Sequence, residues 1–171
     1  MKTLHSIIII AIFAVALFAP PVAAQVGTTW DKKFNGANRF SVLGAFGNAA
    51  VLDKETGLVW EQSPSTTRTG PPGAHAACIT QNIGGRLGWR LPTIQELASL
   101  VDQTQSNPAL TSGHPFSNVQ LDACYRSASI AAPFWSVFFS NNGGVFQGDC
   151  SGGLGGYHWC VRGGQGIDDQ N

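Results

Sequence analysis

The chain has 171 residues, with ten Lys+Arg and ten Asp+Glu, so its formal net charge at neutral pH is zero. No more than two basic residues are adjacent anywhere in it. A neutral chain without a basic patch excludes nucleic acid, anionic membrane surfaces and long polyanions as electrostatically bound partners. The length suits one ordinary domain with a real core.

The amino-terminal 24 residues have the layout of a secretory signal peptide. Met1-Lys2 is a short basic start, residues 7–19 are apolar, and the small residues 22–24 follow two prolines. Because the apolar run is short for a bilayer span, we predict cleavage after Ala24, with an uncleaved membrane anchor as the alternative. The mature protein would then be secreted or periplasmic, without membrane insertion.

The chain has four cysteines, all beyond the predicted cleavage site, at positions 78, 124, 150 and 160. In an oxidising compartment an even set of this kind forms disulfides. Their spacings contain no C-x-x-C, so they do not indicate a zinc or thioredoxin-like site. Three pairings are possible from the sequence.

Short strands open the domain. Residues 25–38 are polar, and we predict a partly ordered lead-in there. The apolar pieces 50–52 and 58–60 have strand length, and residues 53–57 between them have turn chemistry. We therefore predict a β-hairpin whose closing glycine takes the left-handed conformation.

Two helices follow. Residues 74–82 are predicted helical, between a loop over residues 62–73 and a glycine pair that can cap the helix. Thr93 and Glu96 form a capping box, in which each side chain accepts from the other residue's free backbone N–H group. The buried face of this second helix is predicted to comprise Leu97, Leu100 and Val101.

The last third is rich in glycine and aromatic residues. Residues 134–139 and 157–161 are predicted strands, and residues 165–171 a flexible tail. Two short helices among several short strands, without a repeating strand–helix–strand rhythm, indicate an α+β domain with a mostly antiparallel, twisted sheet.

Several motifs, in this order and spacing, resemble the Lcl C-terminal domain family, which was earlier catalogued as a domain of unknown function. They are Thr56-Gly-Leu-Val-Trp60, Gly84-Gly85, Gly88-Trp-Arg-Leu-Pro-Thr93 with Glu96-Leu97, and Cys160-Val-Arg-Gly163. The similarity covers residues 39–164. The chain is also distantly similar to the formylglycine-generating sulfatase-modifying enzymes, and both resemblances imply a C-type-lectin-like fold.

That fold implies a disulfide pairing. C-type-lectin-like domains join a cysteine of the first helix to the final strand and nest a second bridge inside. Applied to this chain, the resemblance implies Cys78–Cys160 enclosing Cys124–Cys150.

One position departs from the family pattern. Where the family has Tyr-Trp-Ser-Ser or a close variant, this chain has Tyr125-Arg-Ser-Ala128, so the sequence leaves open whether Arg126 retains or abolishes a family surface. Trp159 stands where many members have arginine. If these two residues face each other on neighbouring strands, they form a cation–π pair.

The motifs that resemble catalytic or metal-binding sequences have structural explanations. Residues 148–153 resemble a serine-protease motif, but Cys150 interrupts it and the domain is too short for two barrels. His75, His114 and His158 lack metal-ligand spacing. The sugar-binding tripeptides of calcium lectins are missing, and the cysteines are better explained as disulfides than as a copper-binding pair. We expect no metal, no cofactor and no enzymatic activity.

We assign a structural role to the residues of the strongest motifs. Trp89 is expected in the core, and Arg90 is expected to bond carbonyl groups or a carboxylate at the start of the capped helix. The complete structural set is Trp60, Trp89, Arg90, Pro92, Thr93, Glu96 and Arg162.

The candidate ligand-binding surface lies in the last third, where aromatic side chains with polar tips accompany flexible loops. Its predicted residues are Arg126, Trp135, Phe146, Tyr157 and His158. We expect an exported recognition or adhesion module that binds a glycan or a protein. The Lcl family is named for a bacterial collagen-like adhesin, and this resemblance implies sulfated polysaccharide as the ligand class. The neutral charge of the chain favours a neutral glycan or a protein instead.

Two other functions stay open: an envelope hydrolase or modifying enzyme with an unrecognised site, and a structural envelope component. Adhesin relatives can form trimers. Because the chain lacks a collagen-like or heptad repeat, a monomer is expected and a trimer is the alternative.

Overall fold

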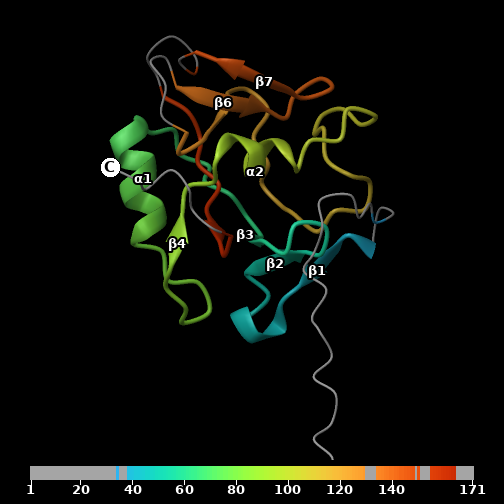
Figure 1. Cartoon of the computed structure of the whole chain (residues 1–171), viewed down its shortest axis with the longest axis vertical. Helices are drawn as coiled ribbons and strands as arrows, with labels where there is room; N and C mark the ends of the chain where they lie inside the picture. Colours follow the sequence, from blue (N-terminus) through green and yellow to red (C-terminus); the bar gives the residue numbers. More distant parts are fainter. Residues whose placement is uncertain (1–33, 35–37, 130–133, 149, 151–154, 165–171) are drawn as a thin grey trace, which may run out of the picture.

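The computed structural model describes residues 34, 38–129, 134–148, 150 and 155–164. The predicted signal peptide, the predicted tail and most of the lead-in lie outside the described residues. Within the described part, no helix has the length and apolar character needed to cross a membrane. The chain forms two antiparallel sheets and two α-helices, so the predicted α+β class is confirmed (Figure 1).

The larger sheet has five strands in the order β1-β2-β3-β8-β4, and every neighbouring pair is antiparallel. Its strands are β1 (Phe40–Val42), β2 (Ala50–Asp53), β3 (Val59–Glu61), β4 (Trp89–Arg90) and β8 (Val161–Arg162). A 3-10 turn, η2 (Gly44–Phe46), connects β1 to β2. The final strand thus inserts between β3 and β4 and brings the end of the domain beside its beginning.

The predicted hairpin is formed by β2 and β3. The carboxylate of Asp53 accepts hydrogen bonds from the Glu55 backbone N–H at 3.0 Å and the Thr56 hydroxyl at 3.0 Å. Gly57 has φ +75°, a left-handed conformation that favours glycine. The turn chemistry seen in the sequence therefore sets the register that pairs Val51 with Trp60.

The first helix, α1 (Pro71–Ile79), begins three residues before the predicted start at residue 74 and ends three before residue 82. The loop predicted over residues 62–73 includes Pro71 and Pro72, which the structure places in the helix. Proline fits the first helical turn, because the backbone N–H groups there have no intrahelical acceptor. At the other end, the Thr80 hydroxyl donates to the Ala76 carbonyl at 2.8 Å and caps the last turn.

The second helix, α2 (Ile94–Ala98), begins at the predicted capping box. The Glu96 backbone N–H donates to the Thr93 hydroxyl at 3.2 Å, and the Thr93 backbone N–H donates to the Glu96 carboxylate at 2.9 Å. Leu97 and Leu100 are fully buried, whereas Val101 is only partly buried. The predicted buried face is confirmed for the two leucines.

The smaller sheet has three strands, β5 (Tyr125–Arg126), β6 (Trp135–Phe138) and β7 (Gly144–Gln147), in that order. Strand β6 lies within the predicted strand 134–139. The prediction of one continuous strand over residues 157–161 was wrong. Tyr157 makes only an isolated parallel bridge to Tyr125, and the regular strand β8 begins at Val161. Just before Tyr157, Gly155 has φ +84° and lies so close to the Thr69 backbone that a side chain would collide with it.

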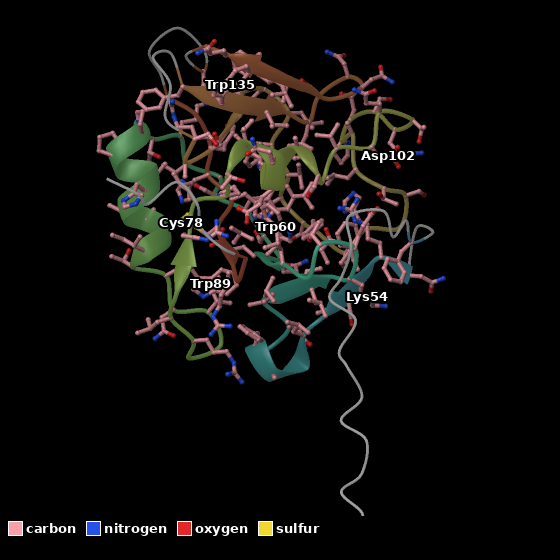
Figure 2. The ribbon with its side chains drawn as sticks, viewed as in Figure 1. Lys54, Trp60, Cys78, Trp89, Asp102 and Trp135 are labelled. Atoms are coloured by element: carbon pink, nitrogen blue, oxygen red, sulfur yellow. A yellow bond between two sulfur atoms is a disulfide. The ribbon has the colours of Figure 1, made fainter. Side chains whose placement is uncertain are left out.

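An aromatic core joins the two sheets. Trp159 packs edge-on against Trp60 from the larger sheet, with ring centroids 5.9 Å apart, and against Phe139, which follows β6 of the smaller sheet, at 5.5 Å. A second apolar cluster around Trp89 lies under α1. Figure 2 shows Trp60 near the centre of the molecule and Trp89 between α1 and β2.

Both disulfides have the pairing that the family resemblance implied. Cys78 of α1 bonds Cys160 beside the final strand, and Cys124 before β5 bonds Cys150 after β7. All four cysteines are buried. One bridge therefore fastens α1 to the larger sheet, and the other fastens the ends of the smaller sheet.

Candidate functional site

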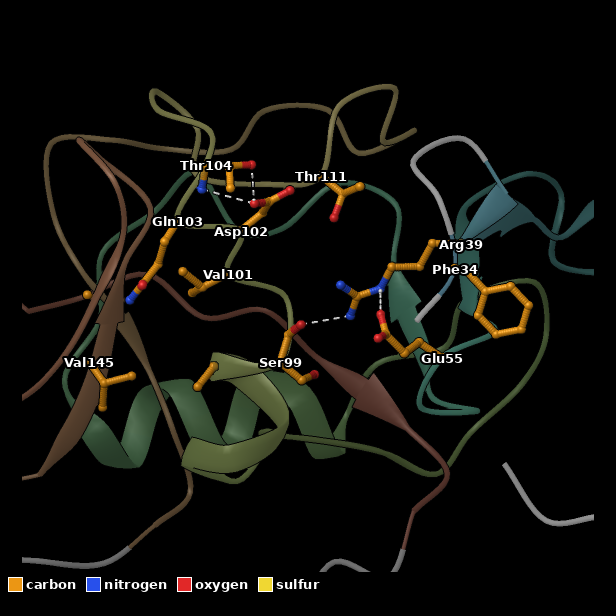
Figure 3. A pocket seen from close by; sticks show the side chains of 12 residues that line it. Phe34, Arg39, Glu55, Ser99, Val101, Asp102, Gln103, Thr104, Thr111 and Val145 are labelled. Carbon is orange, nitrogen blue, oxygen red and sulfur yellow. Dashed lines mark hydrogen bonds and ion pairs between the residues drawn. The ribbon is translucent and has the colours of Figure 1, made fainter. Parts of the chain in front are cut away.

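An open cleft of about 700 Å³ lies where the β2–β3 turn, the chain after α2 and strand β7 meet (Figure 3). Its lining mixes charged, hydroxyl and amide side chains with a few apolar ones: Phe34, Arg39, Glu55, Ala98, Ser99, Val101, Asp102, Gln103, Thr104, Thr111, Gly144 and Val145. Because a ligand site needs a few polar groups in a concave apolar setting, this cleft is the candidate functional site.

One wall of the cleft is a charge cluster around Arg39. Its guanidinium makes two hydrogen bonds to the buried carboxylate of Asp53, at 3.0 and 2.7 Å, and lies 3.1 Å from a carboxylate oxygen of Glu55. It also donates to the Ser99 carbonyl at 2.7 Å, which ties β1 to the end of α2. Arg39 thus faces two carboxylates, and the wall is rigid.

The opposite wall is a tight turn that begins at Asp102. One carboxylate oxygen, Oδ1, accepts from the Thr104 backbone N–H at 3.0 Å and from the Thr104 hydroxyl at 2.6 Å. These two bonds fix the orientation of the carboxylate. Thr111 lines the cleft beside this turn, as Figure 3 shows.

The floor is apolar and tightly joined to the smaller sheet. Val101 and Val145 line it, and Val145 of the edge strand β7 is 47% exposed. The Ala109 backbone N–H donates to the Phe139 carbonyl at 2.8 Å. Gly143 has φ +74° and lies so close to Val101 and Ala109 that a side chain would collide with them. The loop and the β6–β7 turn therefore form one unit.

The predicted binding residues do not form one surface, which corrects that prediction. Arg126, Tyr157 and His158 are buried, with exposed fractions of 3, 5 and 7%. Trp135 and Phe146 are half-buried on strands β6 and β7. The smaller sheet and the chain segment that crosses it bury the three polar side chains, which a sequence pattern does not reveal.

Two of the buried members, Arg126 and Tyr157, have structural partners. The Arg126 Nε donates to the Thr69 carbonyl at 3.1 Å. The Tyr157 hydroxyl donates to the Asp122 carboxylate at 3.0 Å, and Arg68 lies over the Tyr157 ring at 5.4 Å. The hydrogen bond from Tyr157, with Arg68 beside it, lowers the pKa of Asp122.

The expected cation–π contact between Arg126 and Trp159 is not among the contacts of the described residues. Trp159 is fully buried among aromatic rings, with Phe116 at 4.8 Å and Tyr125 at 5.6 Å. The strand pairing places Tyr157, rather than Trp159, beside β5. Trp159 belongs to the core.

The predicted structural set is built around a clamp on Glu96. The guanidinium of Arg90 makes hydrogen bonds of 2.8 and 2.7 Å to both Glu96 oxygens and bonds to the carbonyls of Leu91 and Gly163. This confirms the role expected for Arg90. The same carboxylate completes the capping box, so the Arg90–Glu96 pair links β4, α2 and the chain after β8.

The other members of that set also support the frame. Trp60 and Trp89 are buried in the two apolar clusters, and the Trp89 indole donates to the Arg86 carbonyl at 2.9 Å. The Pro92 carbonyl accepts from the Ala128 backbone N–H at 2.7 Å. Arg162 donates to the Leu87 carbonyl at 2.9 Å.

One buried carboxyl group lies outside the cleft. Glu61 of β3 accepts from the Cys160 backbone N–H at 2.7 Å and from the Gln81 side-chain amide at 2.8 Å. Burial raises its pKa to about 7, although the Cys160 hydrogen bond acts in the opposite direction. Burial also lowers the pKa of His114 and of His158.

The described residues do not assemble a metal site, and the protease-like motif lies mostly outside them. Among the described residues, no group of three His, Cys, Asp or Glu side chains lies close enough together to hold a metal ion. Cys150 of the protease-like motif is in a disulfide, and Asp149 and residues 151–153 lie outside the described residues.

Sequence reasoning missed the cleft itself. The run Asp102-Gln103-Thr104 follows a helix, where an Asp with Thr two residues later signals a side-chain-closed turn. Such a turn is usually only a solvated loop. Its meeting with the hairpin turn at Glu55 depends on contacts between distant parts of the chain.

The fold and the cleft define a small, disulfide-bonded α+β domain with an open polar cleft between its two sheets. The model of the Lcl C-terminal domain family matches residues 49–162, which is more than half of the chain. The chain therefore belongs to the Lcl C-terminal domain family. No curated protein and no solved structure matches it.

Proposed function

We propose that this protein is an exported, non-enzymatic recognition module that binds a glycan in the cleft between the Arg39 wall and the Asp102 turn. A C-type-lectin-like scaffold is part of the proposal. It is supported by two helices, antiparallel sheets and a long disulfide that encloses a shorter one. Export is supported by the two buried disulfides, which persist in oxidising compartments.

The observation that carries the proposal is the chemistry of the cleft. Sugars present many hydroxyl groups, each of which donates and accepts, and carboxylate, amide and hydroxyl side chains can meet both needs. The cleft supplies these groups from Asp102, Gln103 and Thr111, with Val101 and Val145 as apolar contacts for the sugar ring. Its walls are fixed by hydrogen bonds, which lowers the entropy cost of binding.

The second candidate is an envelope hydrolase, because two carboxylates, Glu55 and Asp102, line the same cleft. Each of them already serves a structural contact, Glu55 with Arg39 and Asp102 within its own turn. For this reason we favour binding over catalysis, and we make glycan cleavage an outcome of the test.

The test measures binding of the oxidised protein to a glycan array and compares two arginine substitutions on exposed edge-strand valines. Val145→Arg places a long side chain in the cleft, whereas Val42→Arg adds the same side chain on β1, where Val42 is 42% exposed and does not line the cleft. We expect saturable binding that Val145→Arg abolishes and Val42→Arg retains.

Three other results would change the proposal. Binding that survives Val145→Arg would move the site away from the cleft. Release of shorter sugars during incubation would establish the hydrolase. Binding to no glycan would remove the lectin-like function and leave a protein ligand or a structural role in the envelope.

A further inference from the structure

We infer that the cleft prefers glycans that carry free amino groups over acetylated, sulfated or uronic-acid glycans, and that Asp102 is the residue that selects them. The inference rests on the proposed function, because it names the ligand class of that same cleft. Three features carry it: the charge balance of the lining, the free oxygen of Asp102, and the acceptors beside it.

The described residues of the cleft have a negative charge balance, although the whole chain is neutral. Among the described residues of the lining, Arg39 is the cationic side chain, and Glu55 and Asp102 are the anionic ones. The Arg39 charge is compensated from behind by Asp53, which is fully buried and makes two hydrogen bonds to it. Together these four side chains carry an excess of negative charge, which opposes anionic sugars and attracts cationic ones.

Asp102 presents one carboxylate oxygen to the cleft. Its Oδ1 is occupied by the two Thr104 bonds, whereas its Oδ2 has no hydrogen-bond partner within the described residues. The turn fixes the carboxylate, so a ligand need not order it. A carboxylate oxygen accepts most strongly from a charged donor, which a protonated amino sugar supplies.

An ammonium group has three donors and needs more than one acceptor. The Thr111 hydroxyl lines the same cleft and makes no side-chain hydrogen bond among the described residues. The isolated bridge between Val101 and Leu110 holds Thr111 and Asp102 on adjoining chain segments. The Gln103 side chain is exposed in the lining and offers a further carbonyl oxygen. An acetylated nitrogen is neutral and has a single donor, so it uses these acceptors poorly.

The test is calorimetric titration of the oxidised protein with three probes at mildly acidic pH. The probes are an oligomer of β-1,4-linked N-acetylglucosamine, the same oligomer after removal of its acetyl groups, and a heparin-derived oligosaccharide of similar length. At low salt we expect the deacetylated oligomer to bind about tenfold more tightly than the acetylated one, as a charge-assisted hydrogen bond in a half-open site allows. Physiological salt should narrow this difference.

The variant Asp102→Asn tests whether the preference for the deacetylated oligomer depends on the negative charge of Asp102. The asparagine oxygen can still accept both Thr104 bonds, so the turn is retained while the negative charge is lost. We expect this variant to bind the two glucosamine oligomers equally. Asp122→Asn is the matched control, because Asp122 has a 66% exposed side chain outside the cleft, and it should keep the tenfold preference.

The outcomes separate the inference from the proposed function. Equal binding of the acetylated and deacetylated oligomers by the unaltered protein would overturn the inference and leave the proposed glycan site intact. Tighter binding of the heparin-derived probe would overturn it as well. Binding of none of the three probes would overturn both.

Discussion

In the larger sheet, charged side chains are buried in pairs, whereas the smaller sheet is held by aromatic packing and ends in an exposed strand. Arg39–Asp53 lies at one end of the larger sheet and Arg90–Glu96 at the other. In the smaller sheet, Phe138 stacks on Phe146 with ring centroids 4.8 Å apart. Two neighbouring sheets of one small domain therefore use different means of stabilisation.

This difference distinguishes the structural frame, which is the larger sheet with its Arg90–Glu96 clamp, from the candidate binding cleft. The motifs that carry the family resemblance supply the larger sheet and its clamp, where each charged group is engaged by another part of the chain. The cleft lies at the boundary, where the larger sheet contributes a rigid charged wall and the smaller sheet an exposed valine. Polar groups that can still accept hydrogen bonds, such as Asp102, occur at this boundary, so ligand binding is expected there.

The largest predicted effect concerns the two disulfides, of which each fastens a different sheet. Cys78–Cys160 closes a separation of 82 residues and Cys124–Cys150 one of 26. A chain-entropy estimate gives losses of about 4.5 and 3.5 kcal/mol in the free energy of unfolding when each pair is replaced by serine. The larger sheet should thus depend more on its bridge. Urea unfolding of both double-serine variants measures this.

The two variants control for each other, because all four cysteines are buried and the local cost of serine is similar at each site. An equal loss, or a larger loss for Cys124→Ser with Cys150→Ser, would show that the longer loop does not dominate. The comparison between the sheets would then have to rest on packing alone.

The sequence was most informative for those parts of the larger sheet and its clamp that depend on contacts between residues close together in the chain. The capping box at Thr93 and Glu96 and the turn at Asp53 each depend on residues within three or four positions, and both have the expected contacts. The family resemblance supplied the disulfide pairing, which spacing alone left open. Arg90 was placed correctly because its partner Glu96 is six residues away.

The site could not be predicted in the same way. Arg126 and Tyr157 have polar tips that suit a ligand, but their hydrogen bonds go to Thr69 and Asp122, which are distant in the sequence. Their burial follows from the crossing of the chain between sheets, which no local pattern encodes. The cleft likewise needs Glu55 and Asp102 together, and only the folded chain brings them near each other.

The second prediction concerns the pH dependence of the larger sheet. Burial raises the pKa of Glu61 from its ordinary value of 4.5 to about 7. Below pH 4.5 the folded and unfolded states both hold the proton, and between the two values only the folded state does. Stability is therefore highest below the unfolded value and is lost as the pH rises through about 7. The shift corresponds to about 3 kcal/mol.

Glu61→Gln tests this, because the amide cannot ionise and still offers an oxygen to the Cys160 N–H group. His114 and His158 have lowered pKa values and act in the opposite direction, losing stability as the pH falls. The informative quantity is hence the difference in unfolding free energy between the variant and the unaltered protein. We expect this difference to shift by about 3 kcal/mol in favour of the variant as the pH rises from 4.5 to 7. Parallel profiles would contradict it.

The smallest predicted effect lies in the smaller sheet, at Gly143. A Cβ atom there would lie 2.5 Å from Val101 Cγ1 and 3.0 Å from Ala109 Cβ, on a backbone with φ +74°. Gly143→Ala should lower the free energy of unfolding by about 2 kcal/mol, from left-handed strain and displacement of the loop. Because Val101 lines the cleft, glycan affinity should fall as well.

Gly144→Ala is the matched control for that change. The adjacent glycine also lines the cleft, yet a Cβ atom on it meets no neighbour within 4 Å and its φ is not positive. It should leave stability nearly unchanged. If both variants lose glycan affinity equally, the floor of the cleft acts through direct contact with the ligand. If only Gly143→Ala does, the junction between the Asp102 loop and the β6–β7 turn shapes the site, so this turn acts on the ligand through the position of Val101.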